Sequence, residues 1–295
     1  MPAPTIPTLA SIVSEGLKQA GIKSPSPDLT TRAQEEWMLE IKEIIWNKEK
    51  KLTCLQTTSH GILTKGQSRY SMPTDYASDL TVVLLEGDKS GVAQGGGADT
   101  IILAADETAT ENDLIGYEIL VTSGTGVASL SQIIAYDEST KEATVAPNFN
   151  TAPASGSAYL IVNREWPIDV KLVQRLDAGE KFIGLKRPEK AYIQGDEDFG
   201  EFQFDSPPDK VYGARLRYYA NILRTDTDST LMSSLYLRWK NLFTGWITYK
   251  ALDWGNNTRK DGEFQKHLLR LNELIIREKY GVDTSNVTET VSDFS

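Results

Sequence analysis

The segment from residue 88 to 163 limits the fold most, because no helical period appears anywhere in it. Short apolar and β-branched runs alternate with turn residues instead, at the spacing of a small sandwich or barrel. The runs are Thr100–Leu103, Tyr117–Thr122, Gln132–Tyr136, Glu142–Val145 and Tyr159–Val162. The stretch GDKSGVAQGGG before them has the composition of a flexible linker. We therefore expect an all-β domain, a small barrel or sandwich, over residues 88–163.

Helical periodicity appears on both sides of this segment. Four helical stretches are expected. The first begins after Thr8 and the second after a cap at Asp28 or Thr30. The third runs from about Thr230 to Trp254 and the fourth from about Asn257 to Tyr280. Trp37 and Trp46 lie in the second stretch, where aromatic residues at helical spacing mostly bury area, so we expect both in the core. The third stretch is too apolar for a one-sided helix and is expected to be buried on most sides.

These patterns predict an α+β chain. Residues 1–87 and 164–280 are expected to form a body, a helical bundle with a small antiparallel β-sheet. The all-β domain of residues 88–163 would interrupt this body at an exposed hairpin tip, a position that tolerates insertions. The last 15 residues, 281–295, are Ser/Thr-rich, acidic and aperiodic, and we expect an extended C-terminal arm there.

The formal charge of −10 is unevenly distributed. Residues 95–163 hold nine acids and one base, a charge of −8, and residues 281–295 carry −3. The remainder is close to neutral at +1, which argues against a protein that grips nucleic acid, since that needs a basic surface. No run approaches the ~20 apolar residues that span a bilayer. The single cysteine, Cys54, excludes an internal disulfide framework and fits assembly in a reducing cytoplasm.

Residues for nucleophilic or metal chemistry are scarce. The chain has two histidines, His60 and His267, and neither has a partner at ligand spacing, so we expect structural or solvated side chains. Gly124-Thr125-Gly126 lacks the Lys-Ser/Thr of a phosphate loop and is interpreted as a hairpin turn. The acids of residues 195–201 leave a loose divalent site open, although their spacing is not that of an EF-hand. We predict no catalytic, cofactor or metal residues and no enzyme.

The stretch SPPDKVYGARLRYYANIL, residues 206–223, predicts a strand that begins after two prolines. Tyr212, Ala214, Leu216 and Tyr218 would line one face and Val211, Arg215, Arg217 and Tyr219 the other. Two interpretations of the arginines stay open. They are solvated side chains of an ordinary strand, or they meet the acids of a neighbouring subunit.

The order of several short motifs resembles a known family. The motifs are WMLEIK at residues 37–42, YSMPTDY at 70–76, RPEKAY at 187–192, PPD at 207–209 and RLRYY at 215–219. A Thr-Asp linker, a buried helix, an amphipathic helix and a short tail follow them. This series is similar to the head-to-tail adaptor proteins of tailed bacteriophages, the SU10-like adaptor family of short-tailed phages. The segment of residues 95–163 also resembles a module common in phage structural proteins.

The resemblance implies a virion structural protein at the head–tail interface, assembled in the cytoplasm of the host bacterium. It implies a homo-oligomer, a dodecameric ring, that joins the portal protein to the next nozzle or tail component. DNA would pass through the lumen without specific binding, and tail fibres are further partners through the insertion. No cofactor, membrane or catalysis is implied. The arm of residues 281–295 would reach an adjoining virion protein, with Val287, Val291 and Phe294 as apolar anchors.

Two other functions stay open on the residues. One is a tail-associated receptor-binding or glycan-binding protein that uses the β insertion. Its stacking aromatics would be Tyr117, Tyr136, Phe149 and Tyr159, although in a small β domain such residues are more typical of the core. The other is a tail-borne hydrolase that acts through paired carboxylates, whose separation depends on the fold rather than on local sequence.

Overall fold

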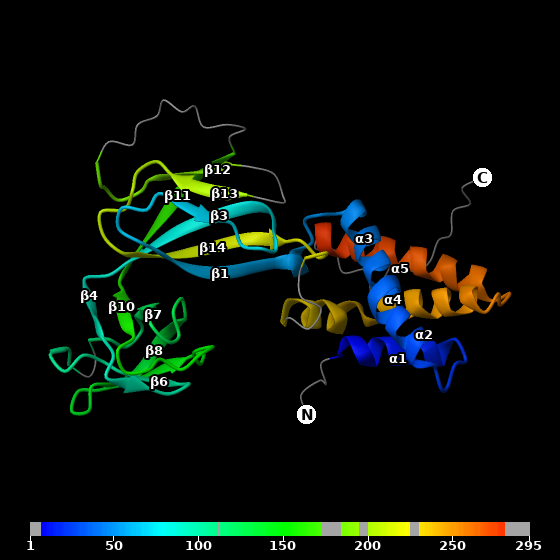
Figure 1. Cartoon of the computed structure of the whole chain (residues 1–295), viewed down its shortest axis with the longest axis horizontal. Helices are drawn as coiled ribbons and strands as arrows, with labels where there is room; N and C mark the ends of the chain where they lie inside the picture. The colour runs from blue at the N-terminus through cyan, green and yellow to red at the C-terminus, as the bar shows by residue number, and fades with distance from the viewer. Residues whose placement is uncertain (1–6, 111–112, 173–183, 195–199, 225–229, 281–295) are drawn as a thin grey trace. The chain divides into compact units, whose positions relative to one another are not determined.

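The computed structural model describes residues 7–110, 113–172, 184–194, 200–224 and 230–280. The chain divides into two compact units (Figure 1). The first unit comprises Met1–Thr57, Thr74–Ser78 and Tyr218–Ser295, and the second comprises Thr58–Pro73 and Asp79–Arg217. The helices belong to the first unit and most of the strand residues to the second.

The first unit is built from helices. They are α1 Leu9–Gln19, α2 Pro27–Arg32, the π-helical turn η1 Ala33–Trp37, α3 Met38–Lys48, the 3₁₀ turn η2 Thr53–Leu55, α4 Thr230–Trp254 and α5 Lys260–Tyr280. Thr8 caps α1 as predicted, since its hydroxyl accepts from the Ser11 N–H at 3.2 Å. The cap expected at Asp28 or Thr30 is wrong. Ser26 caps α2, and Pro27 takes the first helical position, where no N–H is needed.

The core of the first unit surrounds α4, and the predicted burial of this helix is confirmed. Its buried residues include Met232, Leu235, Tyr236, Trp239, Leu242, Phe243, Trp246 and Ile247. Trp37 and Trp46 lie in the same core, as predicted. Gly16 brings α1 against α4, because a Cβ there would lie 2.6 Å from Ile247 Cβ. The Thr248 hydroxyl donates to the Gly16 carbonyl at 3.1 Å, so α1 and α4 are joined where they pack most closely.

One of the two seven-stranded sheets is called here the first sheet. In spatial order its strands are β1 Gln56–Leu63, β14 Tyr212–Ala220, β3 Tyr76–Glu86, β11 Arg164–Leu172, β12 Lys190–Gln194, β13 Glu201–Phe204 and β2 Arg69–Ser71. Residues 64–68 join β1 to β2, which lie at opposite edges. Seven flat strands would separate these edges by about 29 Å, whereas the link reaches roughly 20 Å when fully extended. The sheet therefore curls.

The predicted helical bundle with a small antiparallel sheet is wrong as a fold class. The described residues hold 14 strands in two seven-stranded sheets, and β11 pairs parallel with β12. The sequence pattern did not predict the first sheet, because its strands pair with partners that are far away along the chain. β3 pairs with β11, for example, through Leu84 opposite Trp166. Local periodicity shows that a strand exists but not how many strands join one sheet.

The second sheet occupies residues 89–162 and closes on itself. Its order is β4 Lys89–Val92, β10 Ala158–Val162, β7 Glu118–Ser123, β8 Leu130–Asp137, β9 Glu142–Ala146, β6 Thr100–Ile102 and β5 Gly95–Gly96. The outermost strands, β4 and β5, are consecutive parts of one stretch, so this sheet forms a small barrel, called here the barrel. The barrel encloses its own apolar core, which includes Ile101, Ile119, Ile133, Tyr136, Val145, Phe149 and Tyr159.

Each of the five runs predicted as strands in this region forms one, but the expected flexible linker is wrong. The glycine-rich stretch holds β4 and β5, where the chain turns the corner that closes the barrel. A Cβ at Gly91 would lie 2.6 Å from the Tyr159 hydroxyl, and one at Gly96 would lie 2.7 Å from the Thr100 carbonyl. Glycine is present because neighbours approach the backbone closely. The predicted turn at Gly124 and Gly126 is confirmed, and both have a φ of 82°.

Candidate interaction surfaces

Strand β14 has the two faces that the sequence predicts. Tyr212, Ala214, Leu216 and Tyr218 are buried, whereas Arg217 is exposed. Pro208 lies before the strand, and its carbonyl accepts from the Gly66 N–H at 2.9 Å. Arg217 has no ion pair among the residues that the structure describes.

Arg215 is bound to two carboxylates of its own chain. Its Nη2 lies 2.8 and 2.6 Å from the two oxygens of Glu118 on β7, and its Nη1 lies 2.8 Å from Glu165 on β11. The side chain is only 12% exposed. The guanidinium of Arg215 is thus paired within its own chain, and Arg217 is the exposed arginine of this strand.

The barrel touches the first sheet beside this arginine. Leu120 of the barrel lies over Gly213, where a Cβ would come within 2.3 Å of its methyl group. Leu85, Leu120 and Val162 form a small buried cluster here, flanked by Ile62, Val83 and Leu130. Apolar contact and a charged hydrogen-bond network therefore meet at the same place.

Glu86 is a buried carboxylate of the first sheet that is bound by side chains from two distant segments. The Trp166 Nε1 donates to Glu86 at 2.6 Å, and Lys210 Nζ lies 2.6 Å from its other oxygen. The Arg187 guanidinium stacks over the Trp166 ring at 4.0 Å. Burial raises the pKa of Glu86, but the hydrogen bonds from Lys210 and Trp166 outweigh it and lower the pKa below its usual value. Arg187 of the RPEKAY motif and Lys210, the residue after the PPD motif, thus both belong to the contacts around Glu86 and Trp166.

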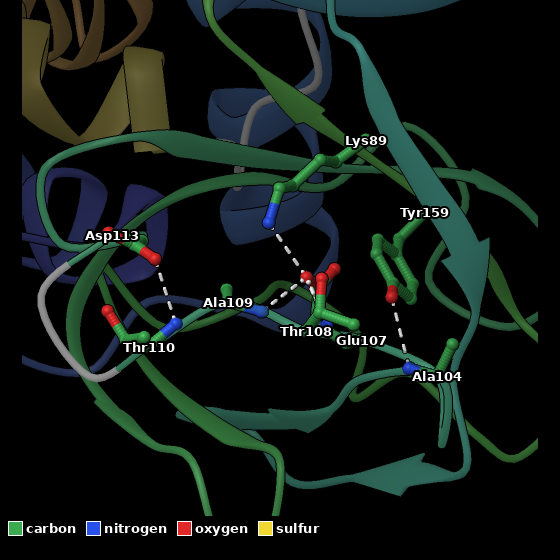
Figure 2. Close-up of polar contacts among 8 residues, drawn as sticks. All are labelled: Lys89, Ala104, Glu107, Thr108, Ala109, Thr110, Asp113 and Tyr159. Carbon is green, nitrogen blue, oxygen red and sulfur yellow. Dashed lines mark hydrogen bonds and ion pairs between the residues drawn. The ribbon is translucent and has the colours of Figure 1, made fainter.

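A second buried carboxylate, Glu107, organises the loop at one end of the barrel (Figure 2). It accepts from Lys89 Nζ at 2.8 Å and from the N–H groups of Thr108 and Ala109 at 2.9 Å. Burial raises the pKa of Glu107, but the hydrogen bonds from these donors outweigh burial, so the pKa lies below its usual value. In the same loop the Tyr159 hydroxyl accepts from the Ala104 N–H at 3.0 Å. This carboxylate has a structural role.

The barrel offers few aromatic side chains for stacking on a sugar. Of the four named from the sequence, Tyr136, Phe149 and Tyr159 are buried in the barrel core, and Tyr117 is exposed. No group of three or more metal-ligating side chains occurs among the described residues. Residues 195–199, which held most of the acids of the possible divalent site, lie outside the described residues.

Both histidines sit in environments that disfavour the charged form. His267 is buried in α5 with its ring 4.6 Å from that of Trp246, and burial together with Arg270 lowers its pKa to about 4. Burial, and then the nearby Arg215, lower the pKa of His60.

Glu278, a buried carboxylate in the first unit, was not predicted from the sequence. This side chain accepts from Thr53 Oγ1 at 2.5 Å, the Cys54 N–H at 3.0 Å and Trp239 Nε1 at 3.1 Å, and Arg238 Nε lies 3.0 Å away. Burial raises the pKa of Glu278, and these donors together lower it below its usual value. An acid in line with Leu271 and Leu274 on the apolar face of α5 is the signal that could have found it.

A cleft of about 230 Å³ opens between the α2–η1–α3 segment and the end of α4. Its lining residues are Arg32, Glu36, Trp37, Glu40, Lys250, Asp253 and Trp254. Arg32 pairs with Glu36 at 2.6 Å and stacks over the Trp254 ring at 4.5 Å. Trp254 is 62% exposed. The cleft has room for one side chain of a partner, and Trp and Arg are residues enriched in interface hot spots.

Helix α5 carries two exposed apolar side chains, Leu269 and Ile276, on the side opposite its buried face. His267, Leu271 and Leu274 face the core, while Leu269 and Ile276, two helical turns apart on the opposite side, are 53% and 43% exposed. We call Leu269 and Ile276, with neighbouring Leu268, the outer stripe of α5. The predicted anchors of the C-terminal arm, Val287, Val291 and Phe294, lie outside the described residues.

Among the helices that the structure describes, none combines the length and apolarity needed to cross a membrane. Comparison with known proteins gives no family. No protein-family model matches the chain, and no curated protein matches it either.

Proposed function

We propose that the chain is a structural protein of the virion, a head-to-tail adaptor that assembles into a ring. The ring would join the portal to the next tail component and continue the DNA channel, and the chain would catalyse nothing. The observation that carries the proposal is the outer stripe of α5. Leu269 and Ile276 lie two turns apart on the side of α5 that faces away from the core, so a second protein surface could bury both side chains.

The charge distribution and the motif order also support this function. The residues outside the barrel segment and the arm are close to neutral, which suits a channel through which DNA slides. The motifs of residues 37–42, 70–76, 187–192 and 207–209 follow one another as in the adaptor family. The portal, the nozzle or tail tube, and tail fibres are the proposed partners, and the head–tail interface of the virion is the proposed location.

Assembly with and without the portal tests the proposal. The purified chain, alone and mixed with portal rings of the phage that encodes it, is examined by light scattering and negative-stain imaging. We expect rings at least in the presence of the portal, because the chain can remain monomeric until the portal ring templates its assembly. The variant Leu269→Asp/Ile276→Asp is expected to stay monomeric, because burying two carboxylates at an interface is costly.

Leu185→Asp serves as the matched control, since Leu185 is an exposed leucine of the second unit. It should assemble like the parent chain. If the Leu269→Asp/Ile276→Asp variant forms rings normally, the outer stripe is not part of the interface between subunits. Absence of any ring or portal complex from the unaltered chain would overturn the adaptor function itself.

A further inference from the structure

The barrel is joined to the first sheet by a two-stranded ribbon within the second unit. β3 continues into β4, and β10 continues into β11, so the two crossings lie side by side (Figure 1). The Asn163 N–H donates to the Glu86 carbonyl at 3.0 Å between them. A Cβ at Gly87 would lie 1.9 Å from the Ile161 carbonyl oxygen, so the strands cross at a point that admits only glycine.

Next to the ribbon, the barrel is held by a small contact, to which Leu85 and Val162 of the ribbon strands contribute. Its apolar part is the buried cluster of Leu85, Leu120 and Val162 with its flanking residues, far smaller than the core inside the barrel. Its charged part is Arg215. Among the ion pairs of the described residues, Arg215 with Glu118 is the one that joins the barrel to the first sheet outside the ribbon.

Arg215 also separates two like charges. Glu118 on the barrel and Glu165 on the first sheet each lie within 2.8 Å of the same guanidinium. Without that cation, the two carboxylates face each other across the contact with no positive charge between them. The interaction between barrel and sheet would then change from attraction to repulsion.

We propose that Arg215 is a conformational latch. It holds the barrel against the first sheet, and release of the latch lets the barrel swing about the ribbon at residues 86–88 and 162–164 while both parts stay folded. The separate apolar core of the barrel supports this, because no residue of the first sheet belongs to it. The inference concerns the motion of the barrel and stands apart from the proposed adaptor function.

A distance measurement between two spin labels tests the latch. The labels are placed at Lys65→Cys, in the link between β1 and β2, and at Glu138→Cys, in the turn between β8 and β9; both sites are exposed. Native Cys54 is half-buried and is replaced by serine in every variant, so that only the two introduced cysteines carry labels. We expect one narrow distance distribution in this labelled parent and a broadened, shifted distribution after Arg215→Gln.

The matched control is Lys171→Gln, which breaks an exposed ion pair with Asp169 at 3.5 Å on β11, away from the ribbon, and should leave the distribution narrow. Circular dichroism of each variant reports whether it is folded. A folded Arg215→Gln variant with the parent distribution overturns the latch. If that variant fails to fold, Glu118→Gln decides, because it keeps Arg215 paired with Glu165. Broadening in Glu118→Gln supports the latch, and an unchanged distribution overturns it.

Discussion

Trp239 donates its indole N–H to Glu278 at 3.1 Å, and it is also the residue at which α4 leaves helical geometry, with φ −121° and ψ 30°. The same carboxylate accepts from Thr53 and from the Cys54 N–H. One buried charge thus ties the break in α4 to α5 and to the turn that precedes β1. Its donors satisfy a group that would otherwise be costly to bury.

Glu278→Gln is expected to destabilise the chain by on the order of 3 kcal/mol, because an amide turns one acceptor oxygen into a donor that faces donors. The free energy of unfolding from chemical denaturation measures the effect. Glu273→Gln, on the exposed side of the same helix with Arg277 at 3.8 Å, should change it little. Equal effects of the two substitutions would show that the network around Glu278 is not stabilising.

Gly213→Ala is expected to cost about 1–3 kcal/mol, because its Cβ would meet Leu120 at 2.3 Å and Leu85 at 3.0 Å. The free energy of unfolding and the position of the barrel should both respond. Gly61→Ala on the neighbouring β1 is the matched control, since no atom lies within 4 Å of its Cβ position. An unchanged stability in Gly213→Ala would mean that Leu120 moves aside freely.

The helices and the barrel strands could be predicted because their signals are local. The Thr8 cap and the buried face of α4 follow from a few adjacent residues. The first sheet could not be predicted in the same way, since β14 and β3 are neighbours in space yet more than a hundred residues apart. The glycines at 91 and 96 looked like a linker because composition does not show which atoms approach them.

For the candidate interaction residues, too, local features could be predicted from the sequence and contacts between distant segments could not. Alternation along β14 predicted which side chains are buried, and Arg217 is exposed as expected. The partners of Arg215 could not be predicted, because Glu118 and Glu165 reach it from strands 97 and 50 residues away. The roles of Glu86 and Glu278 were missed for the same reason: a buried acid is recognised by its donors, and these come from distant segments.

Deletion of residues 88–163 is expected to lower solubility, whatever the chain assembles with. The deletion uncovers Leu85 and Ile62 and leaves Arg215 without Glu118. Light scattering should show nonspecific aggregates, and the same deletion with Leu85→Ser should be more monodisperse. A soluble, well-dispersed deletion variant would contradict the apolar contact between the barrel and the first sheet.

The pH dependence of stability should carry the signature of His267. Burial, and then Arg270, hold its folded-state pKa at about 4, below the ordinary 6.5, so the unfolded chain binds more protons between these values. Its stabilising contribution is therefore complete above pH 6.5 and is lost as the pH falls toward 4. The loss is on the order of 3 kcal/mol, at ~1.4 kcal/mol for each pH unit.

His267→Phe keeps a ring beside Trp246 and cannot take up a proton, so it should flatten this part of the stability profile. Denaturation curves at several pH values measure the free energy of unfolding of this variant and of the parent chain. His60→Gln is the control, and most of the slope should persist there because His267 is the more deeply buried of the two histidines. A parent-like slope between pH 6.5 and 4 in His267→Phe would overturn the assignment to His267, because the buried carboxylates, with lowered pKa values, lose their stabilisation only at lower pH.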